Sequence, residues 1–123
     1  METAVLDPEA RVVIERLAAA RGHALEDGDV AAARRAQSTW LEFTGPVEDV
    51  ASVRNAFVVG PTSELPGRVY TPAGDGPFPA LAFFHGGGWT LGNLEQSDAV
   101  CRALANRSGC VVVAVNYQKA PEH

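Results

Sequence analysis

The fold is decided by one stretch in the second half of the chain, Ala80-Leu81-Ala82-Phe83-Phe84-His85-Gly86-Gly87-Gly88-Trp89. Its first five residues form a continuous apolar run, which is typical of a β-strand buried on both faces of a sheet. A histidine and three glycines follow this run directly. Because glycine has no Cβ, such a loop lets backbone N–H groups come close to an oxyanion. The stretch therefore predicts a buried strand that ends in an anion-binding loop.

A helix and a further strand are expected directly after this loop. Asn93 can cap a helix that begins at Leu94, and Gln96 stands where a capping box requires it. Gly109 fits the position at which a helix ends. Residues 110–115 are again a continuous apolar run. Strand, loop, helix and strand within about 35 residues predict a βαβ unit with two buried strands.

The residues before the stretch predict two shorter strands and two helices. Residues 51–59 and 67–71 are rich in β-branched and aromatic residues, and a cluster of turn residues follows at 73–77. Residues 1–45 have helical spacing of their apolar side chains. The first helix is expected to begin at Pro8 and to end at Gly22, and the second to begin after Gly28 or Asp29.

The composition predicts one globular domain and excludes several classes of protein. The chain has 123 residues, 46% of them hydrophobic and 20% charged, and its net charge is −5. Its ten Lys and Arg residues are scattered and outnumbered by acidic residues, which argues against nucleic-acid binding. No apolar run approaches the ~20 residues of a membrane helix, and the first residues lack the pattern of a signal peptide.

The two cysteines give no sign of a metal or redox site. Cys101 and Cys110 are nine residues apart and have no CxxC or histidine-rich partner. We therefore expect buried free thiols, no bound metal and no cofactor. Together with the absence of a targeting pattern, this predicts a cytoplasmic location.

The glycine loop has two alternative interpretations as a phosphate cradle or a plain structural turn. A dinucleotide-binding loop needs G-x-G-x-x-G, but the register from Gly86 places Leu91 at the last position and Gly92 one residue late. The Gly-Lys-Ser/Thr ending of a P-loop is absent. Three consecutive glycines in a turn cost roughly 0.5–1 kcal/mol each relative to alanine, so a role in anion binding is the simpler explanation.

Several sequence blocks, taken in order, give a specific family resemblance. The chain carries His85-Gly86-Gly87-Gly88-Trp89, Gly92, Asp98, Cys101-Arg102-Ala103-Leu104-Ala105, Val111-Val112-Val113-Ala114-Val115-Asn116-Tyr117 and Ala120-Pro121-Glu122-His123. In order and spacing these blocks resemble the bacterial hormone-sensitive-lipase family of carboxylesterases. The upstream Arg68-Val69-Tyr70-Thr71-Pro72 is similar to the second strand of that family. One departure is Gln118-Lys119, where the family usually has Arg-Leu.

The resemblance implies a fold of the α/β class. We expect the N-terminal part of an α/β-hydrolase sheet, with about four strands, preceded by two cap helices. Residues 1–45 would then form a helical cap segment, and residues 46–123 the N-terminal part of the hydrolase domain. The implied strand order is 1-2-4-3, which leaves the strand at residues 80–84 on an edge of the sheet.

The resemblance also implies an activity and a set of site residues. The family hydrolyses short-chain esters through a Ser-Asp-His triad, and the loop supplies an oxyanion hole from the N–H groups of Gly86, Gly87 and Gly88. His85 is expected to support this loop by hydrogen bonding, in preference to acting as the catalytic base. Trp89 is expected to pack under or beside the loop, and contact with the substrate is the less favoured alternative.

The aromatic residues at the end of the helical segment also have two interpretations. This short segment contains three large apolar residues, Trp40, Leu41 and Phe43, so a helix packed on a core is the favoured interpretation. In the alternative, the segment is a mobile cap, and Trp40 and Phe43 line a substrate pocket together with Trp89. The small-molecule ester substrate is the expected ligand.

The chain contains no nucleophile of the expected kind. Ser38, Ser52, Ser63, Ser97 and Ser108 all lack the flanking glycines of a G-x-S-x-G elbow. We therefore expect no turnover by this segment alone, which would pair with a missing C-terminal half or self-associate through the edge at residues 80–84. The alternatives are a non-catalytic truncated fragment or pseudoenzyme and, less favoured, a nucleotide-binding βαβ module.

Overall fold

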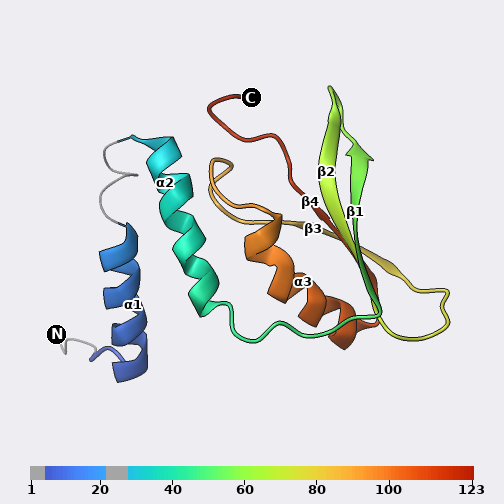
Figure 1. Ribbon diagram of the computed structural model, residues 1–123, viewed down its shortest axis with the longest axis horizontal. Coiled ribbons are helices and arrows are strands. Elements are labelled where there is room, and N and C mark those ends of the chain that lie inside the picture. The colour runs from blue at the N-terminus through green and yellow to red at the C-terminus, as the bar shows by residue number, and fades with distance from the viewer. Residues whose placement is uncertain (1–4, 22–27) are drawn as a thin grey trace. The chain divides into compact units, whose positions relative to one another are not determined.

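The computed structural model describes residues 5–21 and 28–123, and the chain divides into two compact units (Figure 1). The first unit is Met1–Trp40 and the second is Leu41–His123. Gly22, the predicted end of the first helix, lies outside the described residues, as do residues 1–4 of the predicted helical segment.

Two α-helices lie among the described residues of the unit Met1–Trp40. They are α1 (Pro8–Arg21) and α2 (Val30–Gln37). Proline occupies the first position of α1, where its missing N–H has no cost. Asp29 caps α2, because its carboxylate accepts a hydrogen bond of 2.8 Å from the backbone N–H of the third helical residue. Both helix starts agree with the sequence prediction.

A 3-10 helix, η1 (Ser38–Phe43), follows α2 along the chain and ends before Gly45, so the predicted second helix is divided into an α-helix and a 3-10 helix. Its apolar side chains are only partly withdrawn from solvent. Leu41 is exposed, whereas Trp40 and Phe43 are half-buried. The buried indole nitrogen of Trp40 has no hydrogen-bond partner among the described residues.

A four-stranded mixed sheet forms the centre of the unit Leu41–His123. Its strands in spatial order are β1 (Ser52–Val59), β2 (Glu64–Thr71), β4 (Val111–Val115) and β3 (Ala80–Phe84). The β1–β2 and β2–β4 pairs are antiparallel, and the β3–β4 pair is parallel. The predicted strand order 1-2-4-3 is confirmed, and β3 lies at one edge.

Strand β2 begins three residues before the predicted start at residue 67. The hairpin with β1 continues out to the pair Val59 and Glu64, beyond the last residue that pairs with β4. Pro66 lies inside this extension and has no N–H to donate to a neighbouring strand. Its carbonyl still accepts a hydrogen bond of 2.8 Å from the N–H of Asn116.

The helix α3 (Leu94–Ser108) packs on the sheet and creates the core (Figure 1). The Asn93 side chain caps its start at 2.9 Å from the N–H of Gln96, and Gly109 ends it in the left-handed conformation. Both ends agree with the prediction. The fully or nearly buried core residues are Tyr70, Leu94, Cys101, Ala105, Val112 and Ala114.

The prediction that residues 80–84 are buried on both faces is wrong. Leu81 and Phe83 pack against the core below α3, but Ala80, Ala82 and Phe84 are exposed, and Phe84 is 63% exposed. The reason is that β3 is an edge strand and α3 covers only the face that carries Leu81 and Phe83.

Both cysteines are free, as predicted, but they differ in burial. Cys101 on α3 is fully buried in the core, whereas Cys110 precedes β4 and is half-buried. Cys110 stands outside the core because β4 begins one residue later than the apolar run predicts.

Candidate functional site

The glycine loop connects β3 to α3 and lies at the carboxyl end of the parallel pair β3 and β4. This end of a parallel strand pair is where α/β proteins place their ligands. The loop extends from His85 to Gly92, and Asn93 then caps the helix. The predicted order of strand, glycine loop and helix is therefore confirmed, and the binding of an anion by residues 85–92 stays a prediction.

The loop needs glycine at two positions for steric reasons. A Cβ on Gly87 would overlap the carbonyl of Leu91, and a Cβ on Gly92 would overlap the His85 ring and the carbonyl of Gly86. Gly88 has open space around it but adopts a φ of +59°. The loop is thus folded so tightly on itself that only glycine permits its backbone path.

Trp89 continues this unusual backbone and does not pack against the loop. Its φ of +57° makes it the one described non-glycine residue in the left-handed region. Its side chain is 79% exposed, so the prediction that it packs under or beside the loop is wrong. The left-handed backbone carries the side chain away from the core. Bulky residues rarely adopt this conformation, and such strained positions cluster at functional sites.

The N–H groups of Gly86, Gly87 and Gly88 take no part in the loop's own hydrogen bonds. Inside the loop, Gly87 is an acceptor: its carbonyl receives the N–H of Leu91 at 2.8 Å and that of Thr90 at 3.2 Å. Among the described residues, none accepts a hydrogen bond from the N–H groups of the three glycines. Gly86 and Gly88 are exposed and Gly87 is half-buried, so these donors can reach a bound group.

His85 lies beneath the loop and not on its surface. It is 7% exposed, and its Nδ1 lies 2.9 Å from the carbonyl oxygen of Gly86. Because a carbonyl can only accept, Nδ1 is the donor in this contact. Nε2 is buried and has no partner among the described residues. The ring also stacks on Tyr117, with centroids 4.3 Å apart.

The residues that follow β4 hold the loop from the other side. The hydroxyl of Tyr117 donates to the His85 carbonyl at 2.7 Å, and the N–H of Ala120 donates to the Trp89 carbonyl at 2.9 Å. Lys119 Nζ donates to the Gly92 carbonyl at 3.0 Å. The start, middle and end of the glycine loop are therefore each bonded to residues 117–120.

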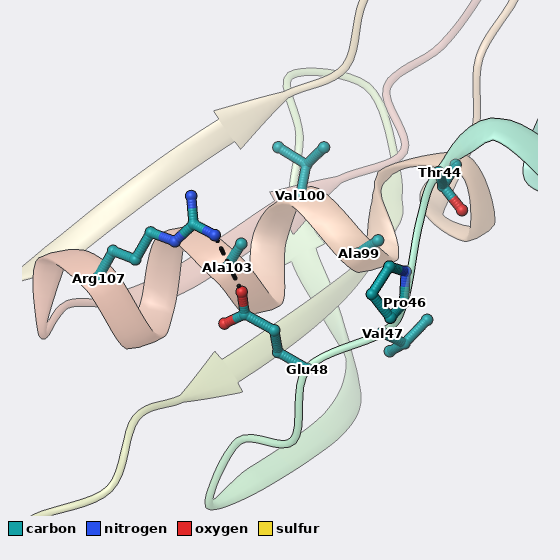
Figure 2. A pocket seen from close by; sticks show the side chains of 8 residues that line it. All are labelled: Thr44, Pro46, Val47, Glu48, Ala99, Val100, Ala103 and Arg107. Carbon is teal, nitrogen blue, oxygen red and sulfur yellow. Dashed lines mark hydrogen bonds and ion pairs between the residues drawn. The ribbon is translucent and has the colours of Figure 1, made fainter.

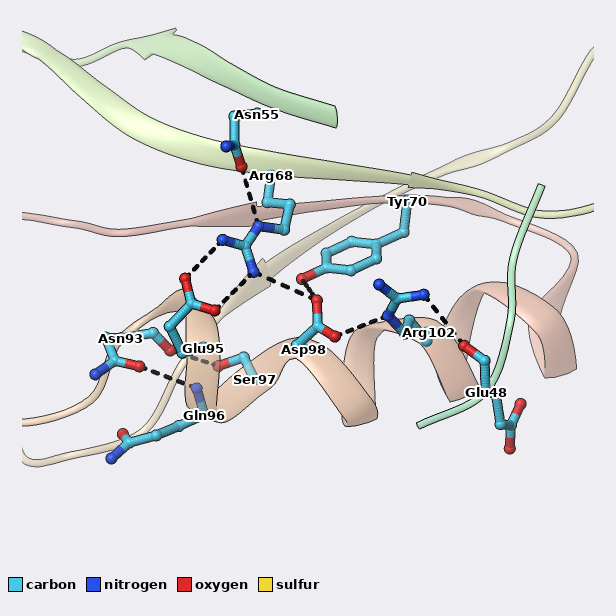
Figure 3. Close-up of polar contacts among 10 residues, drawn as sticks. All are labelled: Glu48, Asn55, Arg68, Tyr70, Asn93, Glu95, Gln96, Ser97, Asp98 and Arg102. Atoms are coloured by element: carbon cyan, nitrogen blue, oxygen red, sulfur yellow. Dashed lines mark hydrogen bonds and ion pairs between the residues drawn. The ribbon is translucent and has the colours of Figure 1, made fainter. Parts of the chain in front are cut away.

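A network of charged side chains fixes α3 to β2 next to the loop (Figure 3). Arg68 on β2 binds both carboxylate oxygens of Glu95, at 2.7 and 3.2 Å, and contacts Asp98 at 3.4 Å. Asp98 also accepts from the Tyr70 hydroxyl at 3.0 Å and from Arg102 Nε at 2.7 Å. Since Glu95 stands in the first turn of α3, the network sets the place where the loop joins the helix.

The electrostatics of this network favour its charged form. Burial of the Asp98 carboxyl opposes ionisation, but hydrogen bonds from Arg102 and then Tyr70 outweigh burial and lower the pKa of Asp98. The hydrogen bond from Arg68 lowers the pKa of Glu95. Burial, followed by the contact with Asp98, raises the pKa of the Tyr70 phenol. The carboxylates are thus ionised and Tyr70 is a neutral donor at neutral pH.

Sequence reasoning did not find this network. Arg68, Asp98 and Arg102 stand out in the sequence only as parts of family blocks, because charges separated by about 30 residues give no local pattern. One part of the network could have been predicted, because Asp98 and Arg102 have the i,i+4 spacing of a helical ion pair.

The structure also has an open hollow of about 320 Å³ that involves none of the predicted site residues (Figure 2). It lies between the outer face of α3 and the segment 44–48, and the Arg107–Glu48 ion pair of 3.2 Å borders it. Its lining is Thr44, Pro46, Val47, Glu48, Ala99, Val100, Ala103 and Arg107. The hollow is therefore separate from the glycine loop.

The structure brings His85, Gly86, Gly87, Gly88 and Trp89 together in one loop. Trp40 belongs to the other compact unit, and Phe43 stands near the start of the second unit, so their role in a pocket stays a prediction. In the described part of the chain, no three His, Cys, Asp or Glu side chains gather in a way that could hold a metal ion. Within the same residues, no helix is both long and apolar enough to cross a membrane.

Comparison with known proteins agrees with this geometry. Residues 81–123 match a protein family whose members have the α/β-hydrolase fold. Over 120 residues, the chain is 37% identical to the carboxylic ester hydrolase LipN of Mycobacterium tuberculosis, a match that covers 96% of this chain. The chain therefore has the α/β-hydrolase fold. The predicted likeness to hormone-sensitive-lipase-type carboxylesterases and the predicted fold class are both confirmed for this α/β-hydrolase.

Solved structures show the same fold. The α/β-hydrolase chain superposes on the ester hydrolase EH1AB1, from the metagenome of Lake Arreo, with a TM-score of 0.79 and 36% identity, over 97% of this chain and 40% of that one. In sequence, the chain is also 37% identical to an arylesterase of Saccharolobus solfataricus over 78 residues, which are 63% of this chain and 26% of that relative. The match to LipN likewise covers 32% of LipN, so this α/β-hydrolase chain spans about a third of that relative.

Proposed function

We propose that residues 1–123 form the N-terminal part of a serine carboxylesterase for short-chain esters and supply its oxyanion hole. The observation that carries this proposal is the set of N–H groups on Gly86, Gly87 and Gly88, which have no acceptor among the described residues. The named relatives are ester hydrolases, which supports the reaction class. In this proposal, the Ser-Asp-His triad comes from outside residues 1–123.

The chemistry follows from where charge appears in ester hydrolysis. Attack of a serine on the ester carbonyl produces a tetrahedral intermediate whose oxygen carries a negative charge. Rigid N–H donors aimed at that oxygen stabilise the transition state, and loss of one donor typically lowers the rate by ~10²–10³. In the proposed enzyme, Gly87 and Gly88 are the main donors, and Gly86 contributes to the same loop.

His85 supports the loop in this proposal and does not act as the base. Its Nδ1 is occupied by the Gly86 carbonyl, and its ring is buried against Tyr117. A general base must reach the nucleophile's proton, which a buried ring under the loop does not do. The catalytic histidine is therefore assigned to the part of the enzyme outside this chain.

The substrate pocket is the least constrained part of the proposal. Trp89 follows Gly88 directly and presents an exposed indole in a left-handed backbone, which supports a contact with the bound ester. We assign residues 1–45 to a helical cap, through which Trp40 and Phe43 would line the same pocket. Aromatic side chains of this kind suit the apolar part of a small ester.

The open edge of β3 is the proposed place for a partner strand. The edge is uncharged, and Ala80, Ala82 and Phe84 are exposed on it. An uncharged, apolar strand edge is a template for pairing with a further strand. We assign it to the rest of the hydrolase sheet, and in the isolated chain to self-association.

The function is tested in a single-chain enzyme that joins residues 1–123 at His123 to the part of LipN beyond its match. We expect this enzyme to hydrolyse p-nitrophenyl butyrate, and residues 1–123 alone to give no turnover. Gly88→Ala should lower kcat by roughly 10²-fold, because alanine disfavours the φ of +59° and a shift of this backbone would move an N–H donor of the oxyanion hole.

The matched control for this variant is Gly109→Ala. Gly109 has a φ of +65°, close to the +59° of Gly88, and a Cβ at either position meets open space. Gly109 ends α3 and does not belong to the loop, so its substitution should lower stability and leave kcat unchanged. Equal losses of kcat in the two variants, or turnover by residues 1–123 that survives Gly88→Ala, would refute the proposed function.

A further inference from the structure

Lys119 is the only lysine of the chain, and its ammonium group connects two segments that are far apart in sequence. Its Nζ donates to the carbonyl oxygen of Gly92 at 3.0 Å and to Oδ1 of Asn116 at 2.7 Å. The side chain is half-buried. Charge-assisted hydrogen bonds of this length are about twice as strong as neutral ones, so Lys119 ties Gly92 firmly to the segment after β4.

Asn116 gives this contact a fixed base. Its backbone N–H donates to the carbonyl of Pro66 at 2.8 Å, directly after the last residue of β4. Asn116 is therefore bonded to β2 as well as continuous with β4. Because Lys119 bonds the Asn116 side chain, the position of its ammonium is set by the sheet.

Gly92 transmits this position to the loop. Its backbone is so close to the His85 ring and the Gly86 carbonyl that no Cβ would fit between them. Any displacement of Gly92 must therefore move His85 and Gly86, or open a gap between them. Interiors packed this closely pass small shifts on to their neighbours.

We propose that Lys119 is a positioning residue that holds the glycine loop in the geometry required for its N–H donors. This inference rests on the proposed oxyanion role of Gly86, Gly87 and Gly88. Arginine at position 119 can keep both hydrogen bonds, whereas methionine keeps the length of the side chain and loses the donors.

The first test measures amide hydrogen exchange in residues 1–123 and in three variants. The amides of Thr90 and Leu91 are the reporters, because both donate to Gly87. We expect Lys119→Met to accelerate their exchange roughly 10-fold, the size expected for loss of a charge-assisted hydrogen bond. Lys119→Arg should restore slow exchange, which a general loss of stability would not.

Gln118→Met is the matched control. Gln118 is the neighbouring residue, but its side chain contacts Thr62 and Ser63 in the turn between β1 and β2. We expect this variant to leave the exchange of Thr90 and Leu91 unchanged. Unchanged exchange in Lys119→Met, or equal acceleration in the Gln118 variant, would overturn the inference.

A second measurement needs no substitution and so does not depend on how the variants fold. A lysine-specific acetylating reagent reacts at one side chain in this protein, which peptide mass spectrometry separates from the terminal amine. We expect native Lys119 to react at least about 10-fold more slowly than in the urea-unfolded chain, since its Nζ is held by two hydrogen bonds and its side chain is half-buried. Equal rates would contradict the proposed contact.

The same variants separate this inference from the proposed function. In the joined esterase, Lys119→Met should lower kcat and leave KM nearly unchanged, and Lys119→Arg should recover kcat. Faster loop exchange in Lys119→Met without any esterase activity in the joined enzyme would support the contact and refute the function. An active joined enzyme in which Lys119→Met changes neither the loop exchange nor kcat would support the function and refute the role of Lys119.

Discussion

The hydroxyl of Tyr117 donates a hydrogen bond of 2.7 Å to the backbone carbonyl of His85, and the two rings stack with their centroids 4.3 Å apart. One side chain thus holds both the backbone and the ring of the residue that begins the glycine loop. His85 in turn bonds the Gly86 carbonyl. The first peptide of the loop is therefore fixed from outside the loop.

Tyr117→Phe should separate these two contributions. Phenylalanine keeps the stacked ring and removes the donor to His85, which should lower the free energy of unfolding by about 1 kcal/mol. Tyr117→Leu, which also removes the stacking, should cost more, by roughly another 0.5–1.5 kcal/mol. Urea unfolding followed by circular dichroism measures both. A phenylalanine variant as stable as the parent would mean that the hydrogen bond does not hold the loop.

Asp98→Asn should destabilise the chain through its charged network. Asp98 accepts from Tyr70 and Arg102 and faces Arg68, so an amide would leave two guanidinium groups without their shared carboxylate. Breaking a buried ion pair costs about 3–5 kcal/mol, and we expect about 2 because this side chain is 19% exposed. Asp75→Asn, in the exposed turn between β2 and β3, is the control and should be nearly neutral.

The same carboxylate predicts a pH dependence. The pKa of Asp98 is lowered in the folded state from an ordinary value of 3.8. A depressed pKa contributes stability that is fully present above the unfolded pKa and is lost as pH falls through the folded pKa. Unfolding free energies measured between pH 6 and pH 2 should therefore decrease below about pH 4, and the decrease should be smaller in Asp98→Asn. An equal decrease in both proteins would assign the effect to other carboxyl groups.

Cys101 should be unreactive in the folded chain. It is fully buried beside Tyr70, and burial raises its pKa to about 11, so almost no thiolate exists at pH 8. Cys110 is half-buried. We expect a disulfide reagent to label Cys110 first and to reach Cys101 only after unfolding in guanidinium, as peptide mass spectrometry would show. Labelling of Cys101 in the native chain at the rate of Cys110 would contradict the packing of the core.

The elements that could be predicted from sequence are those with strong local signals. Pro8, Asp29, Asn93 and Gly109 mark helix ends through their own backbone chemistry, and the structure places each as expected. The start of β2 was missed because Pro66 reads as a strand breaker. Its tolerance depends on pairing with β1 and on its carbonyl accepting the N–H of Asn116, which are tertiary contacts.

The candidate site likewise has features that the sequence could predict and features that it could not. The sequence could locate the loop, because three glycines after an apolar strand are a local pattern with a physical meaning. It could not show that Trp89 would turn outward or that β3 would be exposed on one face. Burial depends on which elements cover a residue, and apolar composition alone does not reveal that. The contacts of Lys119 and Tyr117 with the loop join residues about 30 positions apart and leave no periodic trace.

The exposed edge of β3 gives the last prediction, which concerns the state of the chain in solution. Phe84 ends β3 and is 63% exposed on an edge strand. Lysine on an edge strand opposes pairing with another strand, because its charge would have to be buried. We expect residues 1–123 to associate at concentrations of about 100 μM, and Phe84→Lys to reduce the associated fraction.

The control for this prediction is Phe57→Lys. Phe57 is 72% exposed on β1, at the opposite edge of the same sheet, so this variant adds the same charge and removes a similar apolar area. Light scattering after size-exclusion chromatography measures the mass of all three proteins. Association that falls only in Phe84→Lys would identify the β3 edge as the contact, because only the position of the charge differs. A parent chain that elutes as a monomer, or an equal response of both variants, would exclude that edge as the site of pairing.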